Sequence, residues 1–272
     1  MIPRAQITGW RRRAPWPSDE QVEQDLVLSR AVVELFSQPL VAEAMAFRGG
    51  TALHKLFLNP PGRYSEDIDL VQVDASPIGA VLDAIRAVLD PWLGEPRRNL
   101  GQGRFSLVYR FETTFQPVRQ MRLKVEINTR EHFTVLGLHR CAFAVESAWF
   151  SRAVDVNTYQ LEELLGTKLR ALYQRKKGRD LYDLWLGLTT LSADASRVVQ
   201  CFERYMEHGG TSVSQAEFEM NLAAKLESKQ FREDLQPLLP SDTKYDVAAA
   251  EACVRAALVE RLHGQPWKSR KR

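Results

Sequence analysis

The chain has 272 residues, 44% of them hydrophobic and 26% charged, and a formal net charge of +3. This composition is typical of a globular protein with two domains, and it excludes collagen, a coiled coil and wholesale disorder. The sequence lacks an 18-residue apolar run and a secretory signal, and its three cysteines are odd in number and far apart, so we expect a cytoplasmic protein with reduced thiols and no membrane partner.

The first half of the chain predicts a mixture of helices and strands. Ser18 and Gln21 stand at capping-box spacing, and helical apolar periodicity then continues to Ser37. The other elements predicted here are a strand at 45–47, a helix at 51–58, a strand at 68–71, a helix at 77–93, and strands at 105–111, at 118–127 and within 141–150.

The second half of the chain changes character at about Asn157. Helical apolar spacing then recurs with few β-branched runs, which predicts a helical bundle. The helical segments are 158–176, 180–191, 194–208, 214–229 and 244–263. We therefore predict an α+β fold, with a mixed-sheet domain and flanking helices over residues 1–155 and a helical-bundle domain over residues 156–272.

The two ends of the chain are strongly basic. Residues 1–13 and 264–272 each hold four Lys or Arg residues and no acidic residue, so the rest of the chain is slightly acidic. The C-terminal basic residues are Lys268, Arg270, Lys271 and Arg272. Such ends suit a polyanionic partner, because basic side chains release counterions from phosphates, but solvated tails account for them at least as well.

Asp67 and Asp69 form the most informative motif. Side chains two residues apart on a strand share a face, so both carboxylates project together, while Ile68 and Leu70 point to the apolar side. Adjacent carboxylates repel unless a cation lies between them, and Mg²⁺ commonly takes one or two carboxylates together with substrate phosphates. If the later strand lies beside this one, Glu126 adds a third carboxylate, and three acids around two metals suit in-line phosphoryl transfer.

Gly49, Gly50 and Thr51 mark a junction between a strand and a helix. Glycine permits close backbone approach and the first N–H groups of a helix bind phosphate, so this junction suits a triphosphate, with a plain tight turn as the alternative. An isolated Asp-x-Asp also occurs on solvated strand edges. The glycine junction, the acid pair and the later acid together favour phosphate chemistry.

With these residues in place, the chain resembles the AbiEii/AbiGii family of nucleotidyltransferase toxins, a branch of the DNA polymerase β-like superfamily. The motifs that carry the resemblance are Phe47-Arg48-Gly49-Gly50-Thr51-Ala52-Leu53, Ser65-Glu66-Asp67-Ile68-Asp69-Leu70, Lys124-Val125-Glu126-Ile127, Gly166-Thr167-Lys168-Leu169-Arg170-Ala171-Leu172 and Arg179-Asp180-Leu181-Tyr182-Asp183-Leu184. Thr51 departs from the serine found in many members of the superfamily, but it keeps a hydroxyl for the phosphate.

The resemblance implies a fold, a site and partners. It implies a nucleotidyltransferase-type sheet domain in which Asp67 and Asp69 bind Mg²⁺, with Mn²⁺ as the alternative, and Glu126 completes the metal site. The residues it places at the nucleoside triphosphate are Gly49, Gly50, Thr51, Ser65 and Lys168, with Asp180 as a further catalytic residue. Family members transfer nucleotides to RNA, several at the tRNA acceptor end, and are encoded beside an antitoxin. RNA and an antitoxin are thus the expected partners, and arrested translation is the expected effect.

The helical block that begins at Gly166 can also be interpreted from its residues alone, without the resemblance. Lys168, Arg175 and Arg179 fall on one side of the helical pattern and could clamp a triphosphate or guide RNA. The alternative is a solvated basic face in which Asp180 only caps a helix. Two other functions also stay open, a nucleotidyltransferase that modifies a small molecule or a protein side chain, and a non-enzymatic nucleic-acid-binding regulator.

Overall fold

The computed structural model describes residues 2–101 and 103–268. Within this part of the chain the backbone forms two compact units. The first unit extends to Tyr159 and includes Leu238–Ser241, and the second holds the other described residues. The boundary predicted at residues 155/156 falls inside the last strand of the first unit, which pairs with its neighbour as far as Tyr159. Arg270, Lys271 and Arg272 of the predicted basic tail lie outside the described residues.

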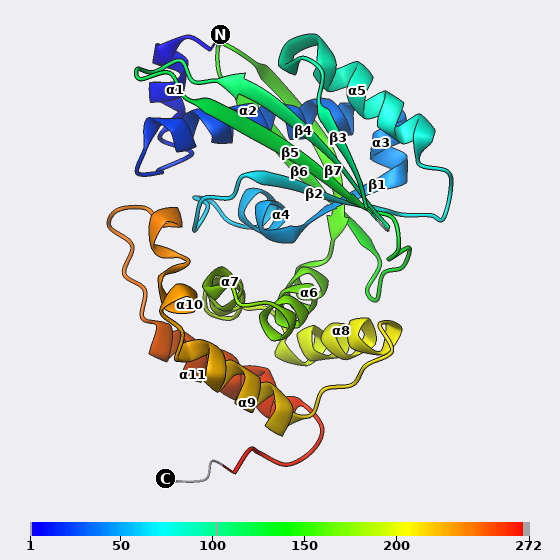
Figure 1. Cartoon of the computed structure of the whole chain (residues 1–272), viewed down its shortest axis with the longest axis vertical. Coiled ribbons are helices and arrows are strands. Elements are labelled where there is room, and N and C mark those ends of the chain that lie inside the picture. Colours follow the sequence, from blue (N-terminus) through cyan, green and yellow to red (C-terminus); the bar gives the residue numbers. More distant parts are fainter. Residues whose placement is uncertain (1, 102, 269–272) are drawn as a thin grey trace. The chain divides into compact units, whose positions relative to one another are not determined.

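The first unit is built on one mixed β-sheet (Figure 1). The strands found in the described residues number seven and follow the order β3-β4-β5-β2-β1-β7-β6. They are β1 (Met45–Arg48), β2 (Asp67–Gln72), β3 (Arg97–Gly101), β4 (Arg104–Glu112), β5 (Gln120–Asn128), β6 (Leu138–Glu146) and β7 (Ser151–Tyr159). The central strand β2 is antiparallel to β1 and parallel to β5. The predicted α+β fold with a mixed sheet is therefore confirmed.

Helices α2 and α5 share the core of the first unit with the sheet. The helices of this unit are α1 (Arg4–Trp10), α2 (Asp19–Ser37), α3 (Pro39–Ala44), α4 (Gly49–Leu56) and α5 (Gly79–Leu93). Ser18 and Gln21 form the predicted capping box at the start of α2. Ile68, Leu70 and Ile127 are almost fully buried in the core to which both helices contribute. Because alternate strand residues point to opposite sides, burying this apolar face leaves a polar face on the sheet.

A buried carboxylate ties α4 to α2 and the N-terminal segment. Asp25 lies on α2 and is 1% exposed. It accepts hydrogen bonds from Trp10 Nε1 at 2.7 Å and Trp16 Nε1 at 2.9 Å, and Lys55 Nζ on α4 lies 2.6 Å from its Oδ1. A buried charge is tolerated only when it is paired and hydrogen-bonded, so these contacts stabilise the position of α4, which begins with the glycine pair.

The basic N-terminal segment belongs to the folded unit. Arg4 begins α1, Arg11 pairs with Asp19, and Arg13 pairs with Glu146. Exposed ion pairs of this kind contribute little to stability, but they engage the guanidinium groups locally. These arginines are therefore placed by intramolecular contacts rather than in a solvated tail.

The second unit is helical, as the sequence predicts. The helices in its described part are α6 (Leu161–Gln174), α7 (Gly178–Thr189), α8 (Ala195–His208), α9 (Gln215–Leu226), α10 (Lys229–Glu233) and α11 (Val247–Ala257), with a short 3-10 turn at Val259–Arg261. A second 3-10 turn, Gln236–Leu238, includes the first residue of the segment Leu238–Ser241. Leu165, Leu169, Phe202 and Phe218 are buried in this unit. In either unit, no described helix is long and apolar enough to cross a membrane.

Candidate functional site

The two central aspartates lie side by side on the polar face of the sheet. Asp67 and Asp69 are the first and third residues of β2, and both are partly exposed. The parallel pairing of β2 with β5 places Lys124 opposite Asp67 and Glu126 opposite Asp69. Strand alternation thus brings the three predicted acids to one face, as expected from the sequence.

Glu126 is held by cations on that face. Its carboxylate pairs with Lys124 on the same strand and lies 3.6 Å from Arg104 Nη1 on β4. No group of three or more His, Cys, Asp and Glu side chains able to hold a metal ion is found in the described ranges. The structure therefore brings Asp67 and Asp69 together, and places Glu126 one strand away in a salt-bridged position.

Gly49 allows the start of α4 to approach Asp69. It has a φ of +80°, a left-handed conformation that favours glycine, and a Cβ added there would lie 3.0 Å from Asp69 Cγ and closer still to its Oδ2. The N-cap residue Arg48 gives α4 no side-chain cap. The first backbone N–H groups of α4 thus have no capping side chain, and such a helix start binds anions such as phosphate.

Replacing Gly49 by alanine is expected to destabilise the first unit by at least about 1–2 kcal/mol, because an L-residue is strained in the left-handed region and its Cβ also displaces Asp69. Urea unfolding measures this loss. Gly79→Ala is the matched control, since Gly79 begins α5, a Cβ there contacts nothing within 4 Å, and its φ is ordinary. Equal destabilisation by both substitutions would contradict the close approach of Gly49 and Asp69.

Two hydroxyls connect α4 to the start of β2. Thr51 Oγ1 donates to the Asp67 carbonyl oxygen at 2.5 Å, and Ser65 Oγ lies 2.8 Å from Thr51 Oγ1. Because the single hydroxyl proton of Thr51 is used on Asp67, Ser65 is the donor between the two hydroxyls. Thr51 is 1% exposed, whereas Ser65 is partly exposed. Thr51 therefore holds Asp67 in place, and of the two hydroxyls Ser65 is the one accessible to a ligand.

The environment of Asp67 fits a cation. The pKa of Asp67 is raised to about 6, chiefly by burial. The charges of Asp69 and Glu66 also raise it, and they outweigh the opposing charges of Lys124 and Arg122. An ionised carboxylate is costly in such a place unless positive charge is added. Two carboxylates with oxygen donors on one face suit Mg²⁺ or Mn²⁺ together with substrate phosphates.

Asp67→Asn is expected to stabilise the metal-free protein by about 1–3 kcal/mol at pH 7.5. The folded pKa of about 6 lies above the ordinary aspartate value of 3.8 that applies to the unfolded chain. Between these values the native state binds more protons, so its stability falls as pH rises. The gain from Asn should shrink to well under about 1 kcal/mol near pH 4, where Asp67 is protonated in the native state and about half ionised in the unfolded chain. Thermal unfolding at both pH values checks this, with the exposed strand residue Asp155→Asn as control. A stabilisation that persists unchanged at pH 4 would contradict the charge argument.

Lys168 and Asp180 meet in the second unit. Lys168 Nζ on α6 lies 3.4 Å from Asp180 Oδ1 and 2.9 Å from Asp183 Oδ2 on α7. Arg175 Nε and Nη2 contact Asp180 at 2.7 and 2.8 Å. Both aspartates are 0% exposed and Lys168 is 5% exposed. Burial raises the pKa of Asp180, but Lys168 and Arg175 lower it more, so Asp180 stays ionised. Asp183, which the sequence leaves outside the site, is thus a full member of this buried ion cluster.

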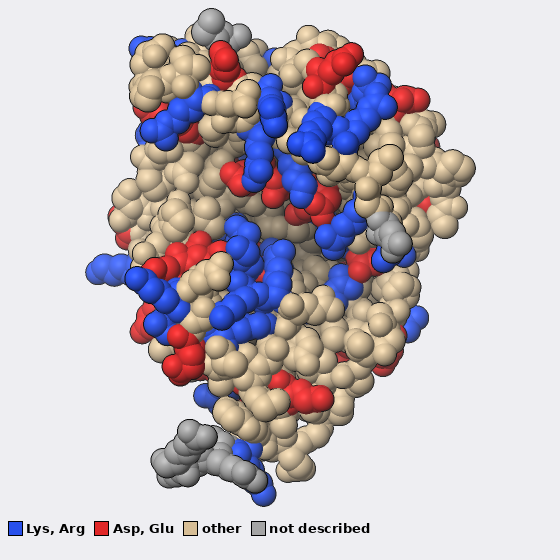
Figure 2. All heavy atoms as spheres, viewed as in Figure 1, with Lys and Arg blue, Asp and Glu red and all other residues tan. Residues whose placement is uncertain are grey.

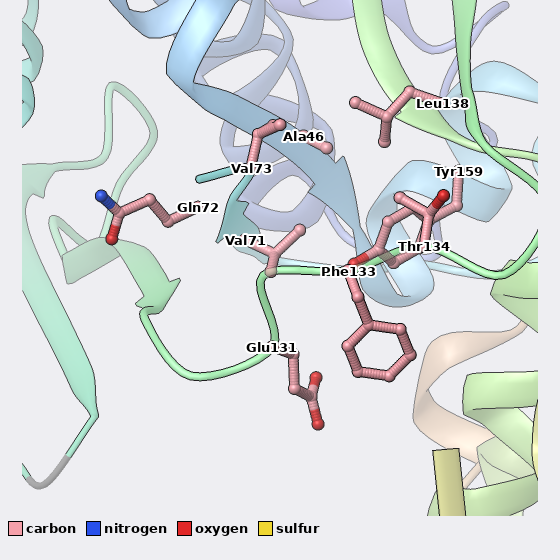
Figure 3. A pocket seen from close by; sticks show the side chains of 9 residues that line it. All are labelled: Ala46, Val71, Gln72, Val73, Glu131, Phe133, Thr134, Leu138 and Tyr159. Atoms are coloured by element: carbon pink, nitrogen blue, oxygen red, sulfur yellow. The ribbon is translucent and has the colours of Figure 1, made fainter. Parts of the chain in front are cut away.

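Sequence reasoning missed an ion pair beside Asp69. Arg48 lies opposite Asp69 across β1 and β2, and its Nη1 is 2.5 Å from Glu131 Oε2. The available signal was alternation, since Arg48 follows the buried Phe47 and so faces the polar side. Glu131 also lines a small pocket with Ala46 and Val71 (Figure 3). Its volume of about 10 Å³ is room for about one water, so it is no nucleotide site.

A larger cavity lies on the opposite, apolar side of the sheet. Its volume is about 290 Å³, and its lining includes Phe111 of β4 and Trp92 of α5. Phe111 alternates with Arg110 and therefore faces away from Asp67 and Asp69. This cavity is consequently separate from the carboxylates.

Comparisons with known proteins point to one family. The family model described as "Nucleotidyl transferase AbiEii toxin, Type IV TA system" matches residues 30–254. Among solved structures, MenT4, a nucleotidyltransferase toxin from Mycobacterium tuberculosis, has 19% identity and a TM-score of 0.69, with 97% of this chain and 91% of that chain covered. JHP933 from Helicobacter pylori has 18% identity and a TM-score of 0.55, with 88% and 90% covered. No curated protein matches the chain. The structural matches establish a shared fold, and the family match spans most of the chain.

Proposed function

Because this chain belongs to the AbiEii family of nucleotidyltransferase toxins, we propose that it transfers a nucleoside monophosphate from a nucleoside triphosphate to the 3′ end of RNA, with the tRNA acceptor end as its target. The chain is a nucleotidyltransferase, and its family belongs to type IV toxin–antitoxin systems, which implies an antitoxin partner. A nucleotide added to the acceptor end of tRNA would block aminoacylation and so arrest translation.

The proposed reaction is an in-line displacement. The RNA 3′ hydroxyl attacks the α-phosphorus, the new P–O bond forms, and the bond to pyrophosphate breaks. Asp67 and Asp69 would hold Mg²⁺, or Mn²⁺ in its place. When bound, a divalent cation neutralises negative charge on the triphosphate and on the leaving pyrophosphate. Glu126, opposite Asp69, is the carboxylate proposed to accept the hydroxyl proton.

The backbone at the start of α4 is the proposed seat of the triphosphate. Gly49 and Gly50 offer N–H groups without a capping side chain, and Ser65 adds a partly exposed hydroxyl. Thr51 supports the site by holding the Asp67 backbone. Helix starts stabilise phosphate because N–H groups and the helix dipole both favour an anion. The approach of this helix start to the paired carboxylates is the observation that carries the proposal.

Lys168 and Asp180 enter the proposal as contributions from the second unit. The resemblance assigns Lys168 to the nucleotide and Asp180 to catalysis. Lys168 contacts Asp180 and Asp183, and Asp180 also contacts Arg175, which supports a role in holding α6 and α7 together. We propose the nucleotide contact of Lys168 in addition to this structural role.

A transfer assay tests the proposed function. The purified protein is incubated with each of the four labelled nucleoside triphosphates, with and without total tRNA, and both pyrophosphate and label on RNA are measured. We expect label on tRNA, loss of transfer with EDTA, and no transfer to tRNA whose 3′ end has been oxidised by periodate. Label on the protein itself or on a small molecule would replace RNA as the acceptor. RNA binding without pyrophosphate release from any triphosphate would overturn the proposal.

A further inference from the structure

One face of the sheet carries a run of positive charge beside the paired carboxylates. Strand pairing places five basic residues on this face of β3, β4 and β5. We call them the basic face, and they are Arg97, Arg104, Arg110, Arg122 and Lys124. Figure 2 shows Lys and Arg side chains gathered over these strands, with acidic side chains beside them. Glu112 and Glu126 are the carboxylates on the same face of these strands, so positive charge is in excess.

The basic face begins at the proposed active site. Lys124 lies opposite Asp67, and Val108 and Arg97 continue the same row across β4 and β3. At about 4.8 Å per strand, the row extends about 14 Å from β2. Burial raises the pKa of Asp67, and the charges of Lys124 and Arg122 oppose that effect. These two cations are thus close enough to act electrostatically on the carboxylate.

Arg110 and Arg122 are a cross-strand pair that the fold does not need. They lie directly opposite each other on antiparallel strands, and both are exposed. Like charges in this position are destabilising, and neither guanidinium forms an ion pair within the described ranges. Arginine on an edge strand guards against aggregation, which accounts for Arg97 on β3, but β4 and β5 are internal strands. A ligand of opposite charge would explain why the pair is present.

We infer that the basic face docks the phosphate backbone of the RNA acceptor and leads its 3′ end to Asp67 and Asp69, an inference that rests on the proposed function. Exposed guanidinium groups bind phosphate oxygens in a bidentate manner and position a nucleic acid without reading its sequence. A surface with several cations that leads away from the site suits several successive phosphates of one strand. The partner is therefore a polyanion longer than a nucleoside triphosphate.

The test uses the Arg110→Gln/Arg122→Gln double variant and total tRNA as the probe. The double variant and the reference protein, which keeps both arginines, each carry Asp69→Asn, so that nucleotide transfer does not alter the tRNA during the measurement. Fluorescence anisotropy over about 50–200 mM NaCl should show about tenfold weaker binding at low salt, and a salt slope reduced by about 1.5, as expected for two lost phosphate contacts. Thermal unfolding should be unchanged or higher, because two like charges are removed.

The matched control is the Arg140→Gln/Arg152→Gln double variant. Arg140 and Arg152 are exposed arginines on β6 and β7 of the same sheet, away from β5. We expect this control to bind tRNA like its reference. In the active background, the Arg110→Gln/Arg122→Gln variant should raise the KM for tRNA about tenfold, in line with its weaker binding, and leave kcat within about twofold.

The outcomes separate this inference from the proposed function. Equal tRNA affinity of the two double variants would overturn the inference, even if the enzyme transfers nucleotides to tRNA. Salt-dependent binding of tRNA through Arg110 and Arg122 without any nucleotide transfer would support the inference and contradict the proposed function. In a third outcome, the reference protein binds no tRNA while the Arg110→Gln/Arg122→Gln variant escapes inhibition by the antitoxin. That result would assign the surface to an acidic protein and overturn the inference.

Discussion

Replacing Asp67 or Asp69 by alanine is expected to lower nucleotide transfer by about a thousandfold or more. Both carboxylates lie on one face of β2, and Gly49 brings the start of α4 against Asp69. A divalent site that loses a charged ligand forfeits several kcal/mol of charge stabilisation, and each loss of about 1.4 kcal/mol costs a factor of ten. The measurement is the initial rate of label transfer to tRNA at saturating triphosphate.

The fold of these variants can be separated from their activity. Burial and neighbouring acids raise the pKa of Asp67, so its charge is costly and Asp67→Ala should unfold at no lower temperature than the wild type. Asp155→Ala removes an exposed aspartate from β7 of the same sheet and should keep the wild-type rate. Near-wild-type turnover by Asp67→Ala or Asp69→Ala would show that the substituted carboxylate is not needed for the reaction.

Local periodicity is sufficient to predict the face that carries the acids. A strand has a fixed period of two, so the apolar residues Ile68 and Leu70 determine where Asp67 and Asp69 point. The same rule places Glu126 on the polar face once β5 lies beside β2, and the structure confirms that pairing. The glycine junction is also visible in the sequence, because a strand followed directly by a helix needs an unusual backbone at Gly49.

The ion-pair partners of the charged residues cannot be predicted from local sequence periodicity. Arg104 reaches Glu126 from β4, and Lys168 reaches Asp183 from a neighbouring helix, so both contacts depend on strand register or on helix packing. A single sequence carries no periodic signal for either. The edge strand β3 is missed for a related reason, since all its residues are exposed and its sequence has no apolar alternation.

Replacing Lys168 by methionine is expected to destabilise the second unit by about 3–5 kcal/mol. Its ammonium lies 3.4 Å from Asp180 Oδ1 and 2.9 Å from Asp183 Oδ2, and both aspartate side chains are 0% exposed. Removing the lysine takes the cation at 2.9 Å away from the buried charge of Asp183, and weakening the pairing of a buried charge costs more than the lost ion pair contributes. Urea unfolding followed by circular dichroism measures the loss.

Two further variants decide whether charge pairing is the cause. Lys168→Met combined with Asp183→Asn should recover part of the lost stability, because the buried negative charge is removed together with its lysine. Lys176→Met removes an exposed lysine two residues before the start of α7 and should change the free energy of unfolding by less than about 0.5 kcal/mol. A Lys168→Met protein that is as stable as the wild type but inactive would instead assign the lysine to the nucleotide. Replacing a residue that serves only to stabilise the fold must lower the free energy of unfolding.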